Sequence, residues 1–299
     1  MSQLSRFTIS MGAFAVIVLA LFVPVQAQTL ASCNFNFFPM FPSSPANSQF
    51  VPMGGNDFGT VVGRVYFSHT TPQLAIQAFI RYSGGGITYY THPNSVYNQF
   101  NQFTARNNNG ANLLMVEPAG EYDYIVQGSS MTKIVVPNSQ WRSTHATAIN
   151  KYNSVVGTYG HLDGYHGGFK RYSNGKFVDL TYPGSVATFP HGINDKGTAV
   201  GSYLDSKYIE HGFIYSNGTW ATLDDPTIKS GRLLGISNGG AILEGLGLSL
   251  YVNGTFKMIS VPNSTSIDVR AMTPGGLIIG IVEFSPDPPD WYDFTAKCQ

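Results

Sequence analysis

The stretch from His191 to Tyr203, HGINDKGTAVGSY, indicates the fold of this 299-residue chain because the chain repeats it. A His211-Gly212-Phe213 element and an Asn217-Gly218 pair follow it. The preceding copy has the same elements in the same order: Ala148-Ile149-Asn150, Val155-Val156-Gly157, His166-Gly167-Gly168-Phe169 and Asn174-Gly175. Weaker copies begin near Asn56, Asn107, Ile236 and Met272. A spacing of about 43 residues is typical of repeats that each form one small sheet.

Each copy predicts a meander of short strands joined by tight turns. Asn-Gly between two apolar runs predicts a type I′ hairpin, because that turn needs positive φ at both central residues. The Asn-x-x-Gly element before the second strand predicts a turn that the Asn side chain caps. A glycine also recurs inside the second strand, where it indicates close approach of a neighbouring backbone. These glycines are Gly63, Gly157, Gly201 and Gly280.

A chain of β-meanders is all-β and forms either an open solenoid or a closed ring. Cys298 follows Phe294 at the distance at which Asn217 follows Phe213, and Cys33 precedes Pro42 as Asn217 precedes Pro226. Both cysteines therefore map to the turn between the third and fourth strands. We expect a β-propeller, with six four-stranded blades, in which the segment 34–41 completes the last blade. A Cys33–Cys298 disulfide would close the ring, with two unpaired thiols as the alternative.

The N-terminal residues predict export. Arg6 precedes an apolar run from Met11 to Val23, and cleavage after Ala27 would remove residues 1–27 as a signal peptide. Residues 28–299 then form a single domain, either secreted or periplasmic. An uncleaved anchor is one alternative, and lipidation of Cys33 within Leu30-Ala31-Ser32-Cys33 is another. No later stretch reaches the roughly 20 apolar residues of a membrane span.

The composition excludes some partners. Lysine plus arginine number 17, aspartate plus glutamate also number 17, and only 11% of residues are charged. Nucleic-acid binding and attraction to an anionic membrane both need clustered positive charge, so neither is expected. An aromatic content of 13% predicts a folded chain.

The repeat resembles the HAF-type extracellular repeat of bacterial secreted proteins over roughly residues 145–226. The resemblance rests on Ile193-Asn194-Asp195-Lys196-Gly197, Val200-Gly201, His211-Gly212-Phe213 and Asn217-Gly218. Elsewhere the copies lack the histidine or the whole His-Gly-Phe element. The resemblance implies an extracellular propeller-like array with no established activity, so no catalytic residue is transferred from it.

Three groups of residues are candidate binding sites. His161, Asp163 and His166 offer imidazole and carboxylate ligands for a divalent metal, although a repeated structural role shared by His166 and His211 explains the histidines as well. The asparagines of the repeated turn could ring one mouth of the channel and bind a polar ligand, or simply cap their turns. They are Asn56, Asn107, Asn150 and Asn194.

The third group is aromatic. Trp291, Tyr89 and Tyr90 could stack on sugar rings, or they could fill the space between blades. Trp291 follows the proline-rich run 286–290, so we expect it in an exposed loop.

These observations favour a monomeric binding or scaffold module for an extracellular glycan or protein, with no catalytic residues and no cofactor beyond a structural metal. The long inserts 91–103 and 117–122 mark the face to examine first. A propeller hydrolase or lyase with a site in the central channel is one alternative. A purely structural envelope protein is another.

Overall fold

The computed structural model describes residues 29–39, 48–67, 76–93, 100–117, 123–137, 143–160, 166–286 and 289–299. Every regular element within these ranges is a strand, and they contain no helix long and apolar enough to cross a membrane. The predicted signal peptide, residues 1–27, lies outside the described residues.

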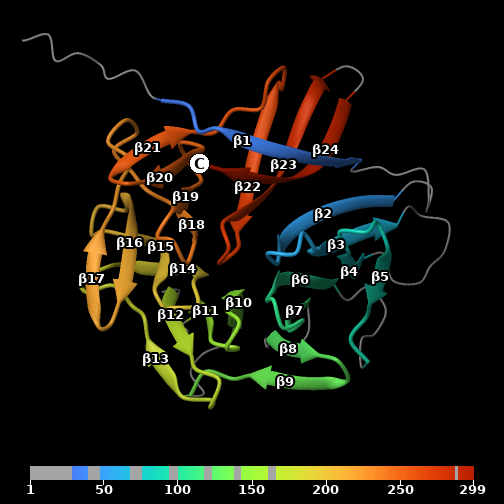
Figure 1. The fold of residues 1–299 in the computed structure, drawn as a ribbon. Helices are drawn as coiled ribbons and strands as arrows, with labels where there is room; N and C mark the ends of the chain where they lie inside the picture. Colours follow the sequence, from blue (N-terminus) through green and yellow to red (C-terminus); the bar gives the residue numbers. More distant parts are fainter. Residues whose placement is uncertain are drawn as a thin grey trace, which may run out of the picture.

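The strands form antiparallel meanders around a common axis (Figure 1). The first sheet comprises β2 (Ser48–Gly55), β3 (Val61–Phe67), β4 (Ile76–Arg81) and β5 (Ile87–Tyr90). The second comprises β6 (Phe100–Arg106), β7 (Asn112–Glu117), β8 (Asp123–Gln127) and β9 (Ser130–Ile134). An eight-stranded sheet comprises β10 (Ser143–Ile149), β11 (Val155–Gly160), β12 (His166–Arg171), β13 (Phe177–Asp179), β14 (Ala187–Ile193), β15 (Ala199–Leu204), β16 (Glu210–Ser216) and β17 (Thr219–Thr222). A further sheet comprises β18 (Leu233–Ile236), β19 (Ile242–Glu244), β20 (Ser249–Val252) and β21 (Thr255–Met258). The last comprises β22 (Ser266–Met272), β23 (Leu277–Pro286), β24 (Pro289–Cys298) and β1 (Cys33–Pro39).

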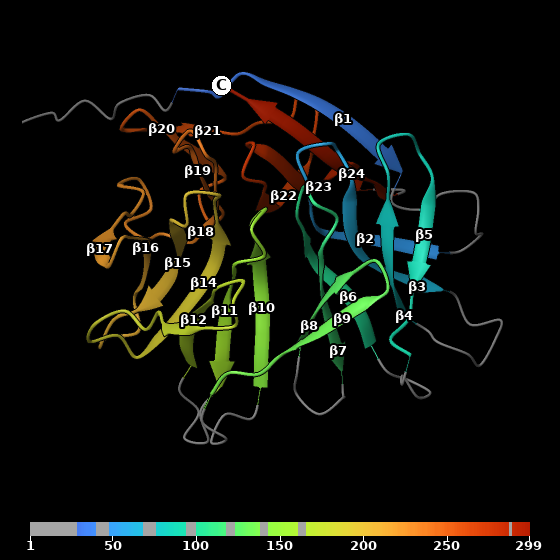
Figure 2. The same ribbon diagram turned by 60° about the horizontal axis from the view of Figure 1, so that its bottom comes forward.

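By hydrogen bonding, the described strands therefore form five sheets rather than the six separate sheets that were predicted. The difference arises where β12 and β14 share one parallel bridge, His166 to Ala187, which joins the meanders β10–β13 and β14–β17. Figure 2 shows the sheets standing side by side around the axis, with β1 crossing above β24. This arrangement is the predicted all-β propeller architecture.

The ring closes as the cysteine spacing predicts. β1 pairs with β24 in antiparallel register, with Cys33 opposite Cys298. The two cysteines form a disulfide, and their Cα atoms are 4.0 Å apart. An early segment of the chain therefore completes the sheet built by its last strands. The disulfide also engages the Cys33 sulfur, to which a lipid would have to be attached.

The recurring strand glycines make room for a phenylalanine and a neighbouring backbone. Gly63, Gly157, Gly201 and Gly280 each pair directly with a phenylalanine of the third strand: Phe79, Phe169, Phe213 and Phe294. A Cβ on any of these glycines would meet that ring and a carbonyl oxygen of the innermost strand. The predicted close approach is thus confirmed, and the four phenylalanines are fully buried.

The Asn-Gly hairpins are of two kinds. Asn217 and Gly218 both have positive φ, at 50° and 83°, as do Asn253 and Gly254, at 52° and 83°. At 174–175 only Gly175 is left-handed, with φ 86°. The predicted type I′ turn is therefore wrong at that position, because the loop is longer and Tyr172 N bonds to Lys176 O across it.

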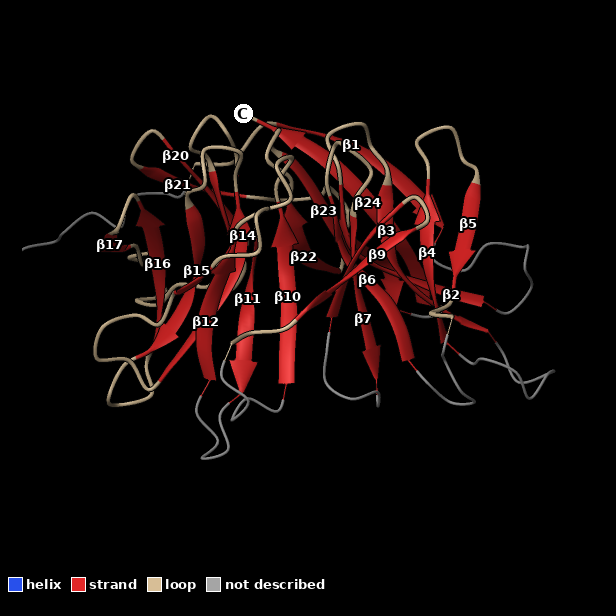
Figure 3. Cartoon of the chain, turned by 90° about the horizontal axis from the view of Figure 1, so that it is seen from below, coloured by secondary structure: helices blue, strands red, loops and turns tan. Residues whose placement is uncertain are grey.

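The repeated Asn turns gather at one end of the channel, which we call the turn end. β10 runs towards this end and β11 runs away from it (Figure 3). The side-chain oxygen of Asn150 accepts hydrogen bonds from Tyr152 N and Ser154 N, and its Nδ2 donates to Asn194 O at 3.0 Å. The amide therefore caps its own turn and also binds the next one.

The same two kinds of bond recur around the ring. Nδ2 groups donate from Asn56 to Asn107 O, from Asn107 to Asn150 O, and from Asn194 to Ser237 O. The circuit closes where Gly275 N donates to Asp57 Oδ1 at 2.7 Å. The turn end is consequently a continuous belt of hydrogen bonds between neighbouring meanders.

Candidate functional site: a pocket at the channel mouth

A β-bulge in every innermost strand aims one side chain at the channel. The register of β2, β6, β10, β14, β18 and β22 shifts by one residue against the neighbouring strand. Such a bulge redirects the extra residue. The bulged residues are Met53, Thr104, Thr147, His191, Leu234 and Arg270. Unlike the belt, these six positions carry five different residue types, so the channel lining is asymmetric.

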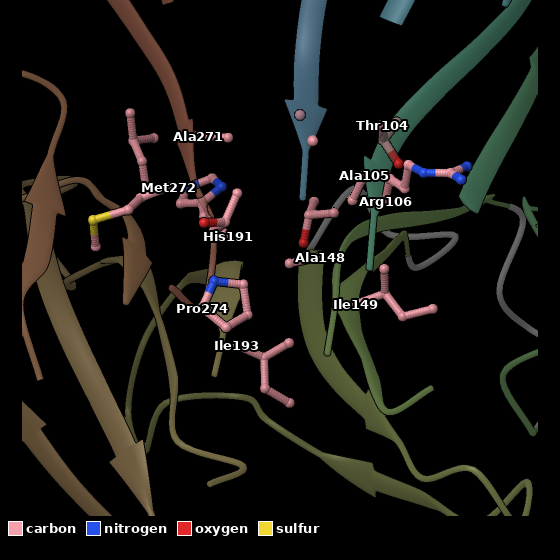
Figure 4. A pocket seen from close by; sticks show the side chains of 15 residues that line it. Thr104, Ala105, Arg106, Ala148, Ile149, His191, Ile193, Ala271, Met272 and Pro274 are labelled. Carbon is pink, nitrogen blue, oxygen red and sulfur yellow. The ribbon is translucent and has the colours of Figure 1, made fainter. Parts of the chain in front are cut away.

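On one side of the channel the bulged residues are threonines that form hydrogen bonds to the innermost strand of the next meander. Thr104 Oγ1 donates to Ala146 O at 2.8 Å, and Thr147 Oγ1 donates to Pro190 O at 2.7 Å. Between these strands and β22 lies a narrow cavity of about 40 Å³ (Figure 4). Such a volume suits water molecules rather than an organic ligand. Arg106 points away from this cavity and bonds to Asn112.

On the other side the channel opens into a pocket of about 570 Å³, which we call the mouth pocket. It lies at the end opposite the turn end, where β15 ends at Leu204 and β16 begins at Glu210. His191 and Leu234 line both this pocket and the narrow cavity. The volume is in the range of sites that bind small ligands or short segments of a partner.

Two ion pairs line the mouth pocket. Arg232 donates from Nε and Nη2 to the two oxygens of Glu210, both at 2.8 Å. Arg270 Nη2 lies 2.6 Å from Asp268 Oδ2. Burial raises the pKa of Glu210, but the hydrogen bonds from Arg232 and Ser202 and the positive charge of Arg232 together outweigh burial and lower the pKa overall. Glu210 is therefore ionised near neutral pH, and the fork of Arg232 is fixed in direction.

A buried glutamate positions Arg232. Glu244 is fully buried, and its carboxylate accepts hydrogen bonds from Arg232 N at 3.1 Å, Leu246 N at 2.9 Å and Gly247 N at 2.5 Å. Burial raises the pKa of Glu244, and these three backbone donors oppose that rise. The carboxylate thus shapes the loop 245–248, which forms one edge of the mouth pocket.

His191 is neutral in this setting. Burial, followed by the positive charge of Arg232, lowers its pKa to about 4. Its Nε2 lies 3.4 Å from Ser202 Oγ. A general base works best with a pKa near the working pH, so this imidazole is poorly suited to take a proton from Ser202. It can still accept or donate a hydrogen bond towards the pocket.

Apolar side chains line the pocket beside these charges. Leu246, Leu204 and Met53 are among them, and Leu246 is 44% exposed. Leu234 and Val269 line the pocket as well. We call these five residues the apolar rim. A concave apolar surface that carries a few placed polar groups is typical of binding sites.

The structure places the predicted asparagines in the belt rather than around an open channel. All four are almost fully buried, and their amides bond to backbone atoms of their own turn and of the next turn. This is the turn-capping role that the sequence also allowed, extended by bonds between meanders.

The three predicted aromatic residues lie at separate places. Tyr89 packs on Phe50 and Phe67. Tyr90 follows it on β5, faces the opposite side of the sheet and packs on Phe103. Burial raises the pKa of both tyrosines. The three do not form one platform.

Trp291 differs from its prediction. It belongs to strand β24, pairs with Glu283 and is partly buried among Val51 and Ile281. The expectation of an exposed loop is wrong because β24 already begins at Pro289, which pairs with Pro286 at the end of β23.

The predicted metal cluster falls mostly on undescribed residues, since His161 and Asp163 lie outside the described ranges. Within those ranges no three histidine, cysteine, aspartate or glutamate side chains are grouped to hold a metal ion. His166 is exposed and its ring lies near Phe189.

His166 and His211 do not share a register position, contrary to the prediction. Gly157 pairs with Phe169 as Gly201 pairs with Phe213, so these pairs are equivalent. Two residues before the phenylalanine, the equivalent positions are Gly167 and His211. The extra glycine places His166 one residue further from Phe169. His211 Nδ1 lies 2.7 Å from Asp224 Oδ2, and its Nε2 lies 3.6 Å from Asp205. These carboxylates raise the pKa of His211, the hydrogen bond with Asp224 contributing most.

The sequence analysis did not predict the bulged residues or the mouth pocket, although a sequence pattern marks the bulges. Each bulged residue stands three positions before the Asn, Ser or Thr of its turn, and a Gly or Ala follows it directly. The following residues are Gly54, Ala105, Ala148, Gly192, Gly235 and Ala271.

No protein-family model matches the chain, and no curated protein matches its sequence. Among solved structures it resembles TolB from Acinetobacter baumannii, with a TM-score of 0.55 and 12% identity over 81% of this chain and 66% of that one. The chain thus spans just under two thirds of TolB. YCF48 bound to a D1 peptide has a TM-score of 0.45 and 13% identity over 88% of this chain and 83% of that one. A gluconolactonase from Xanthomonas campestris has a TM-score of 0.46 and 10% identity over 92% and 99%. The likeness to TolB supports a β-propeller fold and says nothing further about this chain.

Proposed function

We propose that this chain is a binding and scaffold module whose mouth pocket holds an extended segment of a protein partner. The observation that carries the proposal is the apolar rim beside two ion pairs in one concave surface. Arg232 and Glu210 place a positive and a negative charge in one doubly hydrogen-bonded pair, and Arg270 and Asp268 form a second ion pair. A polypeptide segment presents both apolar side chains and polar backbone groups, which matches such a surface better than a ligand of one charge does.

We further propose that the eight-stranded sheet acts as two blades, which makes a six-bladed ring of HAF-type repeats. The support is the periodicity: a bulge and a capped turn recur in both β10–β13 and β14–β17, and a single bridge joins the two meanders. Export after removal of residues 1–27, a secreted or periplasmic location and a monomeric state belong to the same proposal. The disulfide supports an oxidising compartment.

One observation favours the enzyme alternative. Ser202 and His191 lie within reach of each other at the pocket, as a hydrolase nucleophile and base would. The low pKa of His191 and the complete burial of Ser202 argue against that role.

The proposal is tested by selecting a random peptide library, displayed on phage, on the folded chain. Peptides selected by the wild type should lose binding to Leu246→Asp, which places a charge in the apolar rim, and to Arg270→Met. They should still bind Lys176→Met, which removes an exposed charge at the turn end. Peptides that bind all variants equally, or no enriched peptide, would contradict the proposal. Covalent labelling of Ser202 by a fluorophosphonate probe would support a hydrolase instead.

A further inference from the structure

A second concavity lies at the turn end, far from the mouth pocket. It has a volume of about 330 Å³ and lies between the meanders β10–β13 and β14–β17. Its walls carry Tyr152, Tyr172 and Tyr215, together with Lys170 and Lys196. We call it the tyrosine groove. Neither the belt nor the proposed partner site requires these side chains.

Lys170 is a buried cation at this groove, with 7% of its surface exposed. Its Nζ donates to Gly197 O at 2.8 Å and lies 4.9 Å from the centre of the Tyr172 ring. None of the ion pairs among the described residues includes it. A buried ammonium without a carboxylate partner is costly, so an anion bound beside it would be favoured. Burial also lowers the pKa of Lys170, which fits this lack of a counter-ion.

The acidic residue of the groove is already neutralised. Asp195 accepts hydrogen bonds from Lys151 N at 3.0 Å and from Asn238 Nδ2 at 2.8 Å, and it lies 3.8 Å from Lys151 Nζ. Lys196 is exposed at the edge of the groove. Lys170 and Lys196 therefore leave the groove with a positive charge that no described side chain balances.

The aromatic walls indicate what kind of anion fits. Tyr152 is 58% exposed and Tyr172 is 37% exposed, so both have ring surface open to solvent at the rim of the groove. Exposed tyrosine rings offer flat apolar faces with a polar hydroxyl at the edge, which suits the alternating C–H and O–H groups of a pyranose. The exposed amide of Asn217 adds a donor and an acceptor for hydroxyl groups.

We propose that the tyrosine groove binds a carboxylated saccharide, with a uronic-acid carboxylate near Lys170 and Lys196 and sugar rings on Tyr152 and Tyr172. This site is independent of the proposed partner site, because the two lie at opposite ends of the channel.

The experiment is isothermal titration of the folded chain with trigalacturonate, and with its methyl ester as the uncharged probe. Trigalacturonate should bind and the ester should bind at least about tenfold more weakly, since a charge-assisted hydrogen bond is lost. Lys170→Met, which keeps the apolar stem, should lower the affinity for trigalacturonate by a similar factor. Tyr152→Ala and Lys196→Met change exposed side chains and should each weaken binding without affecting the fold.

Two controls separate this proposal from the other. Lys207→Met removes an exposed charge at the opposite end and should leave the affinity for trigalacturonate unchanged. Leu246→Asp should abolish peptide binding at the mouth pocket and leave saccharide binding intact. Equal binding of acid and ester, unchanged affinity in both Lys170→Met and Tyr152→Ala, or no binding of trigalacturonate would overturn the proposal. Equally strong binding of inorganic phosphate would show a general anion site and overturn the saccharide assignment.

Discussion

Arg81 on β4 and Asp293 on β24 form a buried ion pair between the first sheet and the sheet that closes the ring. Arg81 Nη1 lies 3.0 Å from Asp293 Oδ2, and the guanidinium lies 4.1 Å from the centre of the Phe38 ring on β1. Burial raises the pKa of Asp293 to about 7, although Arg81 opposes the rise. The seam of the ring is thus held by a charged contact as well as by strand pairing.

Replacing Arg81 by alanine should lower the free energy of unfolding by about 3–5 kcal/mol, because Asp293 would remain buried without its partner. Urea denaturation measures the loss. The double variant Arg81→Met/Asp293→Leu removes both charges and should recover most of it. A double variant that loses as much as the sum of the two single variants would show that Arg81 and Asp293 are not coupled, and would contradict the prediction.

Removing the disulfide should cost about 5 kcal/mol, because Cys33 and Cys298 are 265 residues apart and the bond restricts the unfolded chain. The comparison is urea denaturation of the wild type and of Cys33→Ser/Cys298→Ser. Reductant added to the wild type should produce the same loss. Wild-type stability that does not respond to reductant while the disulfide is being broken would contradict the entropic account.

Gly201→Ala should destabilise the chain by about 1–3 kcal/mol, because the new methyl group meets Phe189 O and the Phe213 ring. Gly84→Ala is the matched control, since nothing lies within 4 Å of a Cβ at that position. Thermal or urea unfolding of the two variants measures the difference. Equal free energies of unfolding for Gly201→Ala and Gly84→Ala would mean that the innermost strand moves away from the new methyl group at no cost.

Asn150→Ala should lower the free energy of unfolding by about 1–3 kcal/mol, because buried backbone groups of two turns lose their partner. Asn174→Ala provides the comparison, since Asn174 is exposed and accepts one hydrogen bond, from Lys176 N. The belt would have no stabilising role if the two substitutions had the same effect on urea denaturation.

His211 should make stability depend on pH. Its pKa in the folded chain is raised above the ordinary value of 6.5, so the protonated form is favoured by folding. Its contribution is complete below that ordinary value and disappears as the pH rises through the folded pKa. His211→Gln should therefore lose more stability relative to wild type at about pH 5 than at about pH 8. NMR titration of the imidazole gives the pKa directly, and a value at or below 6.5 would disprove the prediction.

The sequence predicts those parts of the fold that depend on local chemistry repeated at a fixed spacing. Gly201 must be glycine because a carbonyl and a ring occupy the place of its Cβ, and Asn150 must reach two backbone donors. Each requirement recurs once per meander, so the repeat is visible. The positions of Cys33 relative to Pro42 and of Cys298 relative to Phe294 predicted ring closure for the same reason.

The candidate site could not be predicted in the same way, because it depends on the residues in which the repeats differ. His191, Leu234 and Arg270 occupy equivalent bulges but have unrelated side chains. Glu210 begins β16 and Arg232 directly precedes β18 of another sheet, and only the ring arrangement places the two together. Spacing alone indicated which positions are equivalent but not which of them line a pocket.

The pairing of β1 with β24 has a consequence for biosynthesis. Of the described strands, β1 is the first to leave the ribosome and its partner β24 is the last to be made. Phe35 and Phe37 on β1 must therefore stay without their final neighbours, Phe294 among them, while all the intervening sheets are synthesised. Closure of the ring is necessarily a late folding event, and a nascent chain that lacks residues 289–298 has an unpaired strand edge at which it can associate with other chains.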